Sequence, residues 1–286
     1  MPLSRRSFSV LTASLATAGL LGAPTVAQAR PRPRVRPLAQ AHAHNDYEHP
    51  RPLFDALAEG FTSVEADIHL VEGRLLVGHD PEDLTPSRTL ESLYLEPLRR
   101  RVLDNHGHVY GRRADFQLLV DIKTEGESTY AALDRLLRHQ RYTPLFSAYA
   151  RARVRRGPVT VVVSGNRPRA TMSAQRHRLA FYDGRIADPT DLGPGSDARL
   201  TPLVSENWTK LFTWAGEGKF PAAERELLES LVNKAHGAGQ RVRFWATPDT
   251  EGPARTALWK ALVDAGVDHV NTDDLSGLAR FLRTKW

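Results

Sequence analysis

The chain has 286 residues, of which 41% are hydrophobic and 25% are charged, so it has enough apolar material for a large core. It contains no cysteine, which excludes disulfides, cysteine nucleophiles and thiolate metal sites. Six arginines and no acidic residue precede Pro37, and these arginines account for the whole formal net charge of +6. The rest of the chain is neutral, so we expect no nucleic-acid partner.

The N-terminal residues have the pattern of an export signal. Arg5 and Arg6 precede an apolar stretch from Phe8 to Gly22, and a small-residue cleavage site, Ala27-Gln28-Ala29, follows. The stretch is shorter than the ~20 apolar residues of a membrane-spanning helix. We therefore predict a twin-arginine signal peptide at residues 1–29 and an Arg/Pro linker at 30–37. The exported chain would be extracellular or periplasmic, without a transmembrane segment, and peripheral contact with a membrane stays open.

From residue 38 onward, short apolar runs alternate with segments of helical spacing. The predicted strands, several of them rich in β-branched or aromatic residues, are Pro37–Ala43, Phe61–Val71, Phe116–Ile122, Val159–Ser164, Leu179–Tyr182, Leu200–Ser205, Arg241–Ala246 and His269–Thr272. The predicted helices are Leu53–Glu59, Leu90–Leu103, Thr129–His139, Ala222–His236, Ala254–Ala265 and Ser276–Arg283. Alternation of this kind implies parallel strands joined by right-handed crossovers.

Two architectures fit this alternation, a closed barrel and an open doubly wound sheet. An open sheet usually has a glycine-rich phosphate loop after its first strand. Here that turn reads Ala43-His-Asn-Asp-Tyr47 and contains no glycine. About 250 residues is also the usual size of one (β/α)8 domain. We therefore predict the α/β fold class, as a single (β/α)8 TIM barrel over residues 38–286.

Titratable residues gather where the first predicted strands end, which is where such barrels place their working groups. Glu65 and Asp67 alternate along one strand and so point to the same side. Two carboxylates that share a barrel mouth repel each other unless a cation neutralises them. Asp121 repeats this placement on the next strand. Three carboxylates without cysteine predict a divalent metal site, with Mg²⁺ or Ca²⁺ favoured over zinc.

Histidines and a lysine complete the predicted site. His44 and His79 lie on segments that flank the strand of Glu65 and Asp67, and imidazole can act as acid or base near neutral pH. Phosphodiester cleavage needs one group that removes a proton from the attacking oxygen and another that protonates the leaving oxygen. Lys123, two residues after Asp121, could neutralise charge on the non-bridging oxygens or pair with a carboxylate.

These motifs resemble the glycerophosphodiester phosphodiesterase and phosphatidylinositol-specific phospholipase C-like superfamily, in the branch that includes altered inheritance of mitochondria protein 6. The segments that carry the resemblance are His42-Ala-His-Asn-Asp-Tyr47, Pro52–Leu57, Gly60–Asp67, Val77-Gly-His79, Thr89–Leu98, Leu118–Thr124, Arg243–Thr247 and Val267–Asp273. The resemblance implies a barrel phosphodiesterase that acts on a small-molecule or lipid-headgroup diester. It also implies that Glu65 and Asp67 bind the metal and that His79 is a catalytic histidine.

The chain departs from the better-known diesterases at two points. They begin with His-Arg-Gly, whereas this chain has His42-Ala-His44-Asn-Asp, so either His42 or His44 could be the first catalytic histidine, and we favour His44. At the third strand many of them place Glu, but this chain has Asp121 followed by Ile-Lys-Thr. That arrangement is more similar to the sphingomyelinase D branch and would keep Asp121 as a metal ligand.

Two other functions stay open at this level. His42-Ala-His44 also matches the His-x-His of amidohydrolase barrels, although the later strands lack the further histidines that such sites need. A catalytically degenerate exported binding protein is the second alternative. Weaker site candidates, which can equally be structural, are Asn45, Asp46, His69, Glu206, Trp245, Asn271 and Asp273.

Overall fold

The computed structural model describes residues 35–284. The predicted signal peptide at residues 1–29 lies outside the described residues, as does the predicted linker at 30–37 except for residues 35–37. In the part of the chain that is described, we find no helix with the length and hydropathy of a membrane span.

Eight parallel strands close into a ring, and this confirms the predicted (β/α)8 TIM barrel. The first strand pairs with both the second and the last, which closes the sheet. The ring strands are β1 (Leu38–Ala43), β2 (Phe61–Val71), β4 (Gln117–Ile122), β7 (Thr160–Gly165), β9 (Ala180–Arg185), β10 (Leu203–Asn207), β11 (Arg241–Trp245) and β12 (His269–Thr272).

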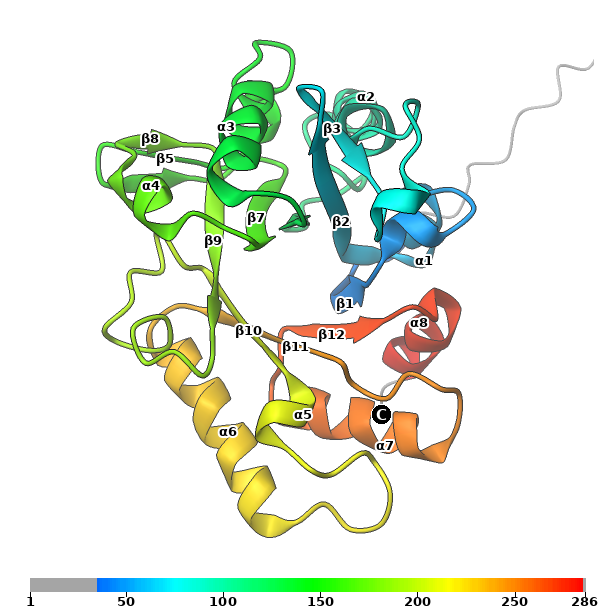
Figure 1. Cartoon of the computed structure of the whole chain (residues 1–286). Helices are drawn as coiled ribbons and strands as arrows, with labels where there is room; N and C mark the ends of the chain where they lie inside the picture. The colour runs from blue at the N-terminus through cyan, green and yellow to red at the C-terminus, as the bar shows by residue number, and fades with distance from the viewer. Residues whose placement is uncertain (1–34, 285–286) are drawn as a thin grey trace, which may run out of the picture. The chain divides into compact units, whose positions relative to one another are not determined.

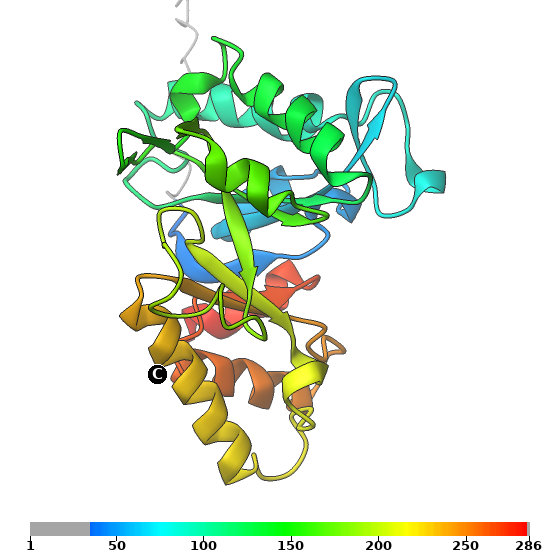
Figure 2. The same cartoon turned by 60° about the vertical axis from the view of Figure 1, so that its left-hand side comes forward.

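Helices pack around the outside of this ring (Figures 1 and 2). They are α1 (Phe54–Glu59), α2 (Glu96–Asp104), α3 (Gly126–Leu137), α4 (Arg169–Ala174), α5 (Trp208–Leu211), α6 (Ala222–Gly237), α7 (Pro253–Asp264) and α8 (Leu275–Arg283). The main hydrophobic core is formed by the buried faces of these helices and the outward-facing residues of the strands. Burial of these faces is the main term that stabilises the barrel.

Most predicted elements are present, and the differences have local causes. The predicted helix Leu90–Leu103 begins as a π-helical turn at Glu91–Leu95 and continues as α2. Strand β9 extends beyond the predicted Tyr182 because it carries polar residues that the apolar pattern could not show. Residues 186–202, all of them described, join β9 to β10 without a helix.

Several elements lie outside the eightfold repeat. β3 (Arg74–Val77) forms an antiparallel hairpin with the end of β2, and β6 (Arg153–Arg155), β5 (Ala148–Ala150) and β8 (His177–Arg178) form a separate small sheet. Short 3-10 helices occur at Asp46–Glu48, Pro81–Asp83 and Thr143–Leu145. The hairpin matters for function, because it returns the chain to the mouth of the barrel at His79.

One half of the barrel interior contains an apolar layer, and the other half is polar. Leu119, Val162, Phe181 and Leu203, on four neighbouring strands, form a hydrophobic cluster of their own. The opposite half contains buried polar side chains from the other strands, namely His42, Ser63, Glu65, Arg243, His269 and Asn271. Because buried polar groups need hydrogen-bond partners, this half must be organised by a network of contacts.

Candidate active site

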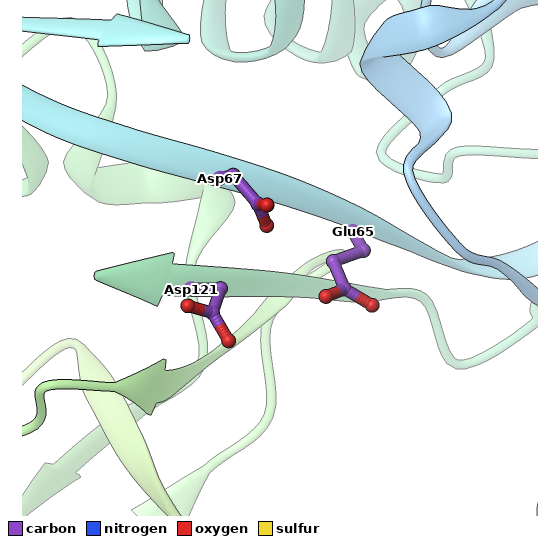
Figure 3. A group of neighbouring side chains, drawn as sticks. All are labelled: Glu65, Asp67 and Asp121. Atoms are coloured by element: carbon purple, nitrogen blue, oxygen red, sulfur yellow. The ribbon is translucent and has the colours of Figure 1, made fainter. Parts of the chain in front are cut away.

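Three carboxylates converge where the sequence placed the metal site. The register pairs Asp67 of β2 with Asp121 of β4, and Glu65 lies two residues before Asp67 on the same face. The three residues each offer an atom within 4.8 Å of the others, and Figure 3 shows their side chains turned toward a common space. Gly165 of β7 packs against this cluster at φ 68°, and a side chain there would overlap the Asp121 carboxylate. The fold thus brings the three predicted ligands together.

Burial and mutual repulsion disfavour the charged forms of the two aspartates in this cluster. Burial raises the pKa of Asp67, and the charge of Glu65 adds to the effect. Burial likewise raises the pKa of Asp121 to about 6, again with a contribution from Glu65. The predicted Lys123 lies beside both, with Nζ 3.0 Å from Asp67 Oδ2 and 3.3 Å from Asp121 Oδ1. Lys123 therefore pairs with carboxylates in this structure, and its charge only partly offsets theirs.

The two oxygens of Asp67 have very different surroundings. Oδ2 accepts a hydrogen bond from the Tyr47 hydroxyl at 2.7 Å and lies 3.2 Å from His79 Nδ1, in addition to Lys123. Oδ1 is buried and has no hydrogen-bond partner among the described residues. An unpartnered buried carboxylate oxygen costs free energy, of the order of 1–3 kcal/mol or more for a charged group. It is therefore the atom of this cluster with the clearest need for a ligand.

His79 follows β3 and stands at the edge of the carboxylate cluster. Its side chain is 49% exposed, and Nδ1 lies 3.1 Å from the Tyr47 hydroxyl as well as 3.2 Å from Asp67 Oδ2. The ring is thus held through one nitrogen and can offer the other, Nε2, to a bound molecule.

His44 lies just beyond β1, where its backbone N–H donates to Thr272 of β12. Its Nδ1 lies 2.9 Å from Asp273 Oδ1, and the backbone N–H of Asp273 in turn donates to Asp249 Oδ2. Burial tends to lower the pKa of His44, but the bond to Asp273 and the charge of Glu65 outweigh burial, so its pKa is raised. With 28% of its side chain exposed, His44 can reach a molecule in the mouth.

His42 occupies a different environment from His44, although alternation places the two residues on the same side of the chain. Its side chain has no exposed surface, and both ring nitrogens are engaged, Nδ1 with Ser63 Oγ at 2.7 Å and Nε2 with Glu65 Oε2 at 3.1 Å. Burial, followed by the charge of Arg243, lowers its pKa well below the usual value. The two histidines do not converge as a chelating pair, because His44 turns toward Asp273 instead.

Arg243 is the main functional residue that sequence reasoning missed on this side of the barrel. Its guanidinium is 3% exposed and donates to Glu65 Oε2 through Nη2 and to Asn271 Oδ1 through Nε. The sequence signal was available, because Arg243 alternates with Trp245 along β11 and therefore points inward. Arg243 pairs with Glu65 as Lys123 pairs with the aspartates, so three carboxylates face two buried or half-buried cations.

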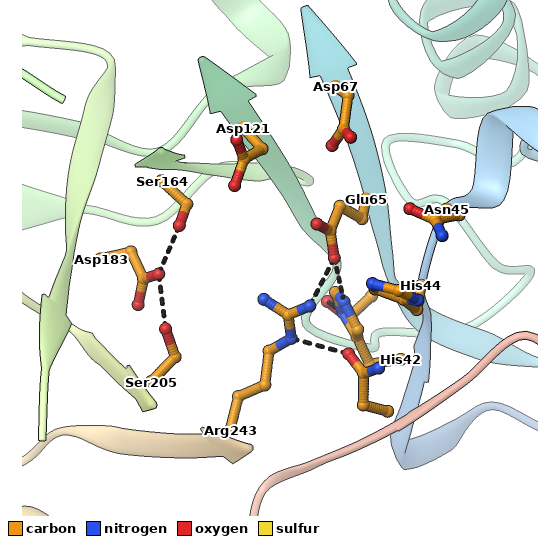
Figure 4. Close-up of polar contacts among 12 residues, drawn as sticks. His42, His44, Asn45, Glu65, Asp67, Asp121, Ser164, Asp183, Ser205 and Arg243 are labelled. Carbon is orange, nitrogen blue, oxygen red and sulfur yellow. Dashed lines mark hydrogen bonds and ion pairs between the residues drawn. The ribbon is translucent and has the colours of Figure 1, made fainter. Parts of the chain in front are cut away.

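A second polar cluster, also not anticipated, lies across the interior. Asp183 of β9 is fully buried, and its Oδ2 accepts hydrogen bonds from the hydroxyls of Ser164 and Ser205 at 2.7 and 2.6 Å (Figure 4). Arg185 Nη1 pairs with the same oxygen at 2.8 Å. Ser164, Asp183 and Ser205 each lie two residues beyond a member of the apolar interior cluster, so they line the barrel toward its C-terminal end.

The weaker candidates divide into structural and peripheral groups. Asp46 is buried and accepts from the Leu53 amide and the Tyr94 hydroxyl, so it braces the turn after β1. Glu206 is buried and holds the backbone at Ala187 and Asn207. His69 Nε2 contacts the backbone carbonyl oxygens of Gly78 and His79. Asn45 accepts from the Tyr47 hydroxyl, Asn271 accepts from Arg243, and Trp245 is half-buried at the end of β11.

Comparison with known proteins identifies the family of this chain. The AIM6-like phosphodiesterase domain matches residues 33–183, and the glycerophosphoryl diester phosphodiesterase family matches residues 241–276. This chain belongs to the AIM6-like phosphodiesterase family. It is 32% identical to altered inheritance of mitochondria protein 6 of Eremothecium gossypii, over 83% of this chain and 68% of that protein. It is 30% identical to the Arthroderma benhamiae homologue, over 81% of this chain and 80% of that one.

Two solved structures that share this fold are enzymes of different groups. A calcium-dependent phosphoinositol-specific phospholipase C from a Pseudomonas species matches with a TM-score of 0.53 at 11% identity, over 82% of this chain and 88% of that one. A glycerophosphoryl diester phosphodiesterase from Parabacteroides distasonis matches with a TM-score of 0.50 at 13% identity, over 87% of each chain. At 11% and 13% identity, this likeness shows that the chain has the barrel fold and nothing more.

Proposed function

We propose that this protein is a metal-dependent phosphodiesterase that cleaves a glycerophosphodiester or the headgroup diester of a phospholipid. One observation carries the proposal: three largely buried carboxylates and Lys123 form a single cluster between two partly exposed histidines, His44 and His79. Family membership supports phosphodiester chemistry in general terms. The family and the fold leave open which alcohol or lipid the diester carries.

The donor set fits a hard divalent cation. Glu65, Asp67 and Asp121 offer oxygen atoms only, and Asp67 Oδ1 is buried without a partner among the described residues. Burial, with a contribution from the charge of Glu65, raises the pKa of both aspartates, and a bound cation would favour their charged forms. We therefore assign these three residues as ligands of Mg²⁺ or Ca²⁺. When bound, the ion would add positive charge where the phosphate's non-bridging oxygens lie.

The two partly exposed histidines suit the proton transfers of diester cleavage. We assign His44 as the base that removes a proton from the attacking oxygen, because Asp273 fixes its ring and stabilises the imidazolium that forms. We assign His79 as the acid that protonates the leaving oxygen, since its Nδ1 is held by Tyr47 and Asp67. Lys123 would hold the phosphate by charge.

The test is diester hydrolysis by the full-length chain before and after chelation. Bis(p-nitrophenyl) phosphate and glycerophosphocholine should be cleaved, EDTA should abolish the rate, and Mg²⁺ or Ca²⁺ should restore it. Phosphorus NMR of the product would distinguish a hydrolysed from a cyclic phosphate, and either product agrees with the proposal. A rate that is indifferent to EDTA, or unchanged in Glu65→Ala, would remove the mechanism.

We also propose export by the twin-arginine route, on the basis of Arg5, Arg6 and the apolar stretch that follows them. An extracellular or periplasmic location would give the enzyme access to lipid headgroups and to diesters released from them. Mass spectrometry of the exported protein should find a new N-terminus after Ala29. Retention in the cytoplasm of a cell that has a twin-arginine system would count against export.

A further inference from the structure

A series of hydrogen-bonded side chains crosses the polar half of the barrel interior. It starts at Arg241, the first residue of β11, whose Nη2 donates to Gln117 Oε1 at 2.8 Å. Gln117 Nε2 donates to Ser63 Oγ at 3.0 Å, and Ser63 Oγ contacts His42 Nδ1 at 2.7 Å. His42 Nε2 then contacts Glu65 Oε2 at 3.1 Å. The series joins the N-terminal end of the barrel to a carboxylate of the proposed metal site.

The donors and acceptors in this series can be arranged in only one consistent direction. A guanidinium only donates, so Arg241 fixes the carbonyl oxygen of the Gln117 amide toward itself and the NH₂ toward Ser63. Ser63 Oγ therefore accepts from Gln117, and among the described residues His42 Nδ1 is the acceptor left for the Ser63 proton. His42 Nδ1 then carries no hydrogen, and the imidazole proton sits on Nε2, where it is donated to Glu65.

This direction determines how Glu65 presents its two oxygens. Oε2 receives His42 Nε2 and also Arg243 Nη2, and Arg243 is itself held by Asn271 through Nε. Figure 4 shows the other oxygen of Glu65 on the side of Asp121. With the reverse tautomer, a bare Nε2 lone pair would face the carboxylate at 3.1 Å, and the two would repel.

We propose that Arg241, Gln117 and Ser63 are positioning residues that fix the tautomer of His42, and that His42 orients Glu65 for the divalent cation. His42 is thereby a positioning residue as well, while His44 supplies the proton transfer. This inference rests on the proposed metal-dependent function, because it predicts a change in metal binding by Glu65. Groups that orient metal ligands from behind commonly change metal affinity by about 10–100-fold when they are altered.

The decisive variant is Gln117→Glu, which has nearly the same shape as the wild type. The new carboxylate would keep its bond to Arg241 but could no longer donate to Ser63. Ser63 would then donate its proton to that carboxylate and would accept from His42 Nδ1, so the imidazole proton would move from Nε2 to Nδ1. We expect Mg²⁺ and Ca²⁺ affinity to fall about tenfold. Simple Coulomb attraction predicts the opposite sign, because the variant adds a negative charge to the barrel.

Gln117→Met is the matched control. It removes the amide without adding a strong acceptor, so Ser63 is no longer held in one direction but can still donate to His42 Nδ1, and metal affinity should fall less than in Gln117→Glu. Two measurements on the full-length chain decide the matter: calorimetric titration with Mg²⁺ and with Ca²⁺, and nitrogen NMR of the His42 ring, which distinguishes the Nδ1–H from the Nε2–H tautomer. Metal binding by Gln117→Glu that equals or exceeds wild type, or an unchanged tautomer, would overturn the proposal.

A second pair of variants tests the same proposal in case Gln117→Glu does not fold. His42→Gln keeps an N–H donor near the position of Nε2, whereas His42→Leu does not, so the first should retain metal affinity and the second should lose it about tenfold. Equal losses would refute a positioning role. Failure of the wild-type chain to bind either ion would instead refute the proposed function. The His42 tautomer observed by NMR would still test the hydrogen-bond series independently of metal binding.

Discussion

Replacement of Asp67 by asparagine should stabilise the protein in the absence of divalent cations and destabilise it relative to wild type in their presence. Asparagine has the shape of aspartate and can still accept from Tyr47 and Lys123, but it carries no charge. The substitution therefore isolates the electrostatic cost of the carboxylate cluster. A residue kept only for packing would show no such reversal of sign.

The size of the effect follows from the geometry. Ligand atoms of Asp67, Glu65 and Asp121 lie within 4.8 Å of one another, so each pair repels by about 3.5 kcal/mol at an effective dielectric constant of ~20. The attraction between Lys123 Nζ and Asp67 Oδ2, which lie 3.0 Å apart, is about 5.5 kcal/mol at the same dielectric constant. The two repulsions exceed this attraction by about 1–2 kcal/mol. Without divalent cations, the free energy of unfolding of Asp67→Asn should therefore exceed that of wild type by this amount. The difference corresponds to a few degrees in Tm for a domain of this size.

Thermal unfolding in EDTA and in saturating Mg²⁺ or Ca²⁺ provides the assay. The wild type should gain about 2.7 kcal/mol at an ion concentration about a hundredfold above Kd, and Asp67→Asn should gain much less. The pKa of Asp67 is raised by folding, so the wild type loses stability as pH rises through that pKa, and the advantage of the variant should shrink toward acid pH.

Asp183→Asn is the matched control for this prediction. Asp183 is equally buried on the same inner surface, but it accepts from Ser164, Ser205 and Arg185 and lies outside the carboxylate cluster. Its replacement should destabilise the protein by about 1–3 kcal/mol in EDTA and in metal alike. If Asp67→Asn behaves like Asp183→Asn, losing stability in EDTA, the electrostatic reasoning is refuted.

Three further predictions follow from the histidines and from a buried aspartate. His44→Gln should lower kcat by about 10²–10⁴ while leaving divalent-ion affinity unchanged; a matching loss of affinity would point to a structural role. His79→Ala should slow glycerophosphocholine cleavage far more than cleavage of bis(p-nitrophenyl) phosphate, whose leaving group needs no proton, and equal losses would contradict its role as the acid. Burial raises the pKa of Asp46 to about 7, so metal-saturated wild type should lose about 2–3 kcal/mol of unfolding free energy as the pH rises from about 5 to about 9. In urea unfolding at a series of pH values, the unfolding free energy of Asp46→Asn should depend much less on pH. A wild-type unfolding free energy that does not change with pH would contradict the raised pKa of Asp46.

The barrel and its carboxylates could be predicted from sequence because period-2 and period-3.6 patterns report directly on which faces are buried. The bounds of β2 and β12 agree with prediction to the residue, and alternation alone placed Glu65 and Asp67 on one side. Asp121 was found because it lies at the end of an apolar strand. In each case the information is local to a few neighbouring residues.

The contacts that define the site depend instead on strand register around the closed ring. Arg243 reaches Glu65 from a strand far along the chain, and Asp273 reaches His44 in the same way. No local pattern pairs such residues. The choice between His42 and His44 is of this kind, since alternation puts both on one side and only the structure separates the buried residue from the partly exposed one.

The most direct test of the central claim is anomalous diffraction from crystals of this protein grown with Mn²⁺, a stand-in for Mg²⁺ with a measurable anomalous signal. A peak coordinated by Glu65, Asp67 and Asp121 together, within reach of a phosphate placed between His44 and His79, is the predicted result. A map without a peak at those carboxylates under conditions that support activity, or one that places the ion elsewhere in the barrel, would contradict the account.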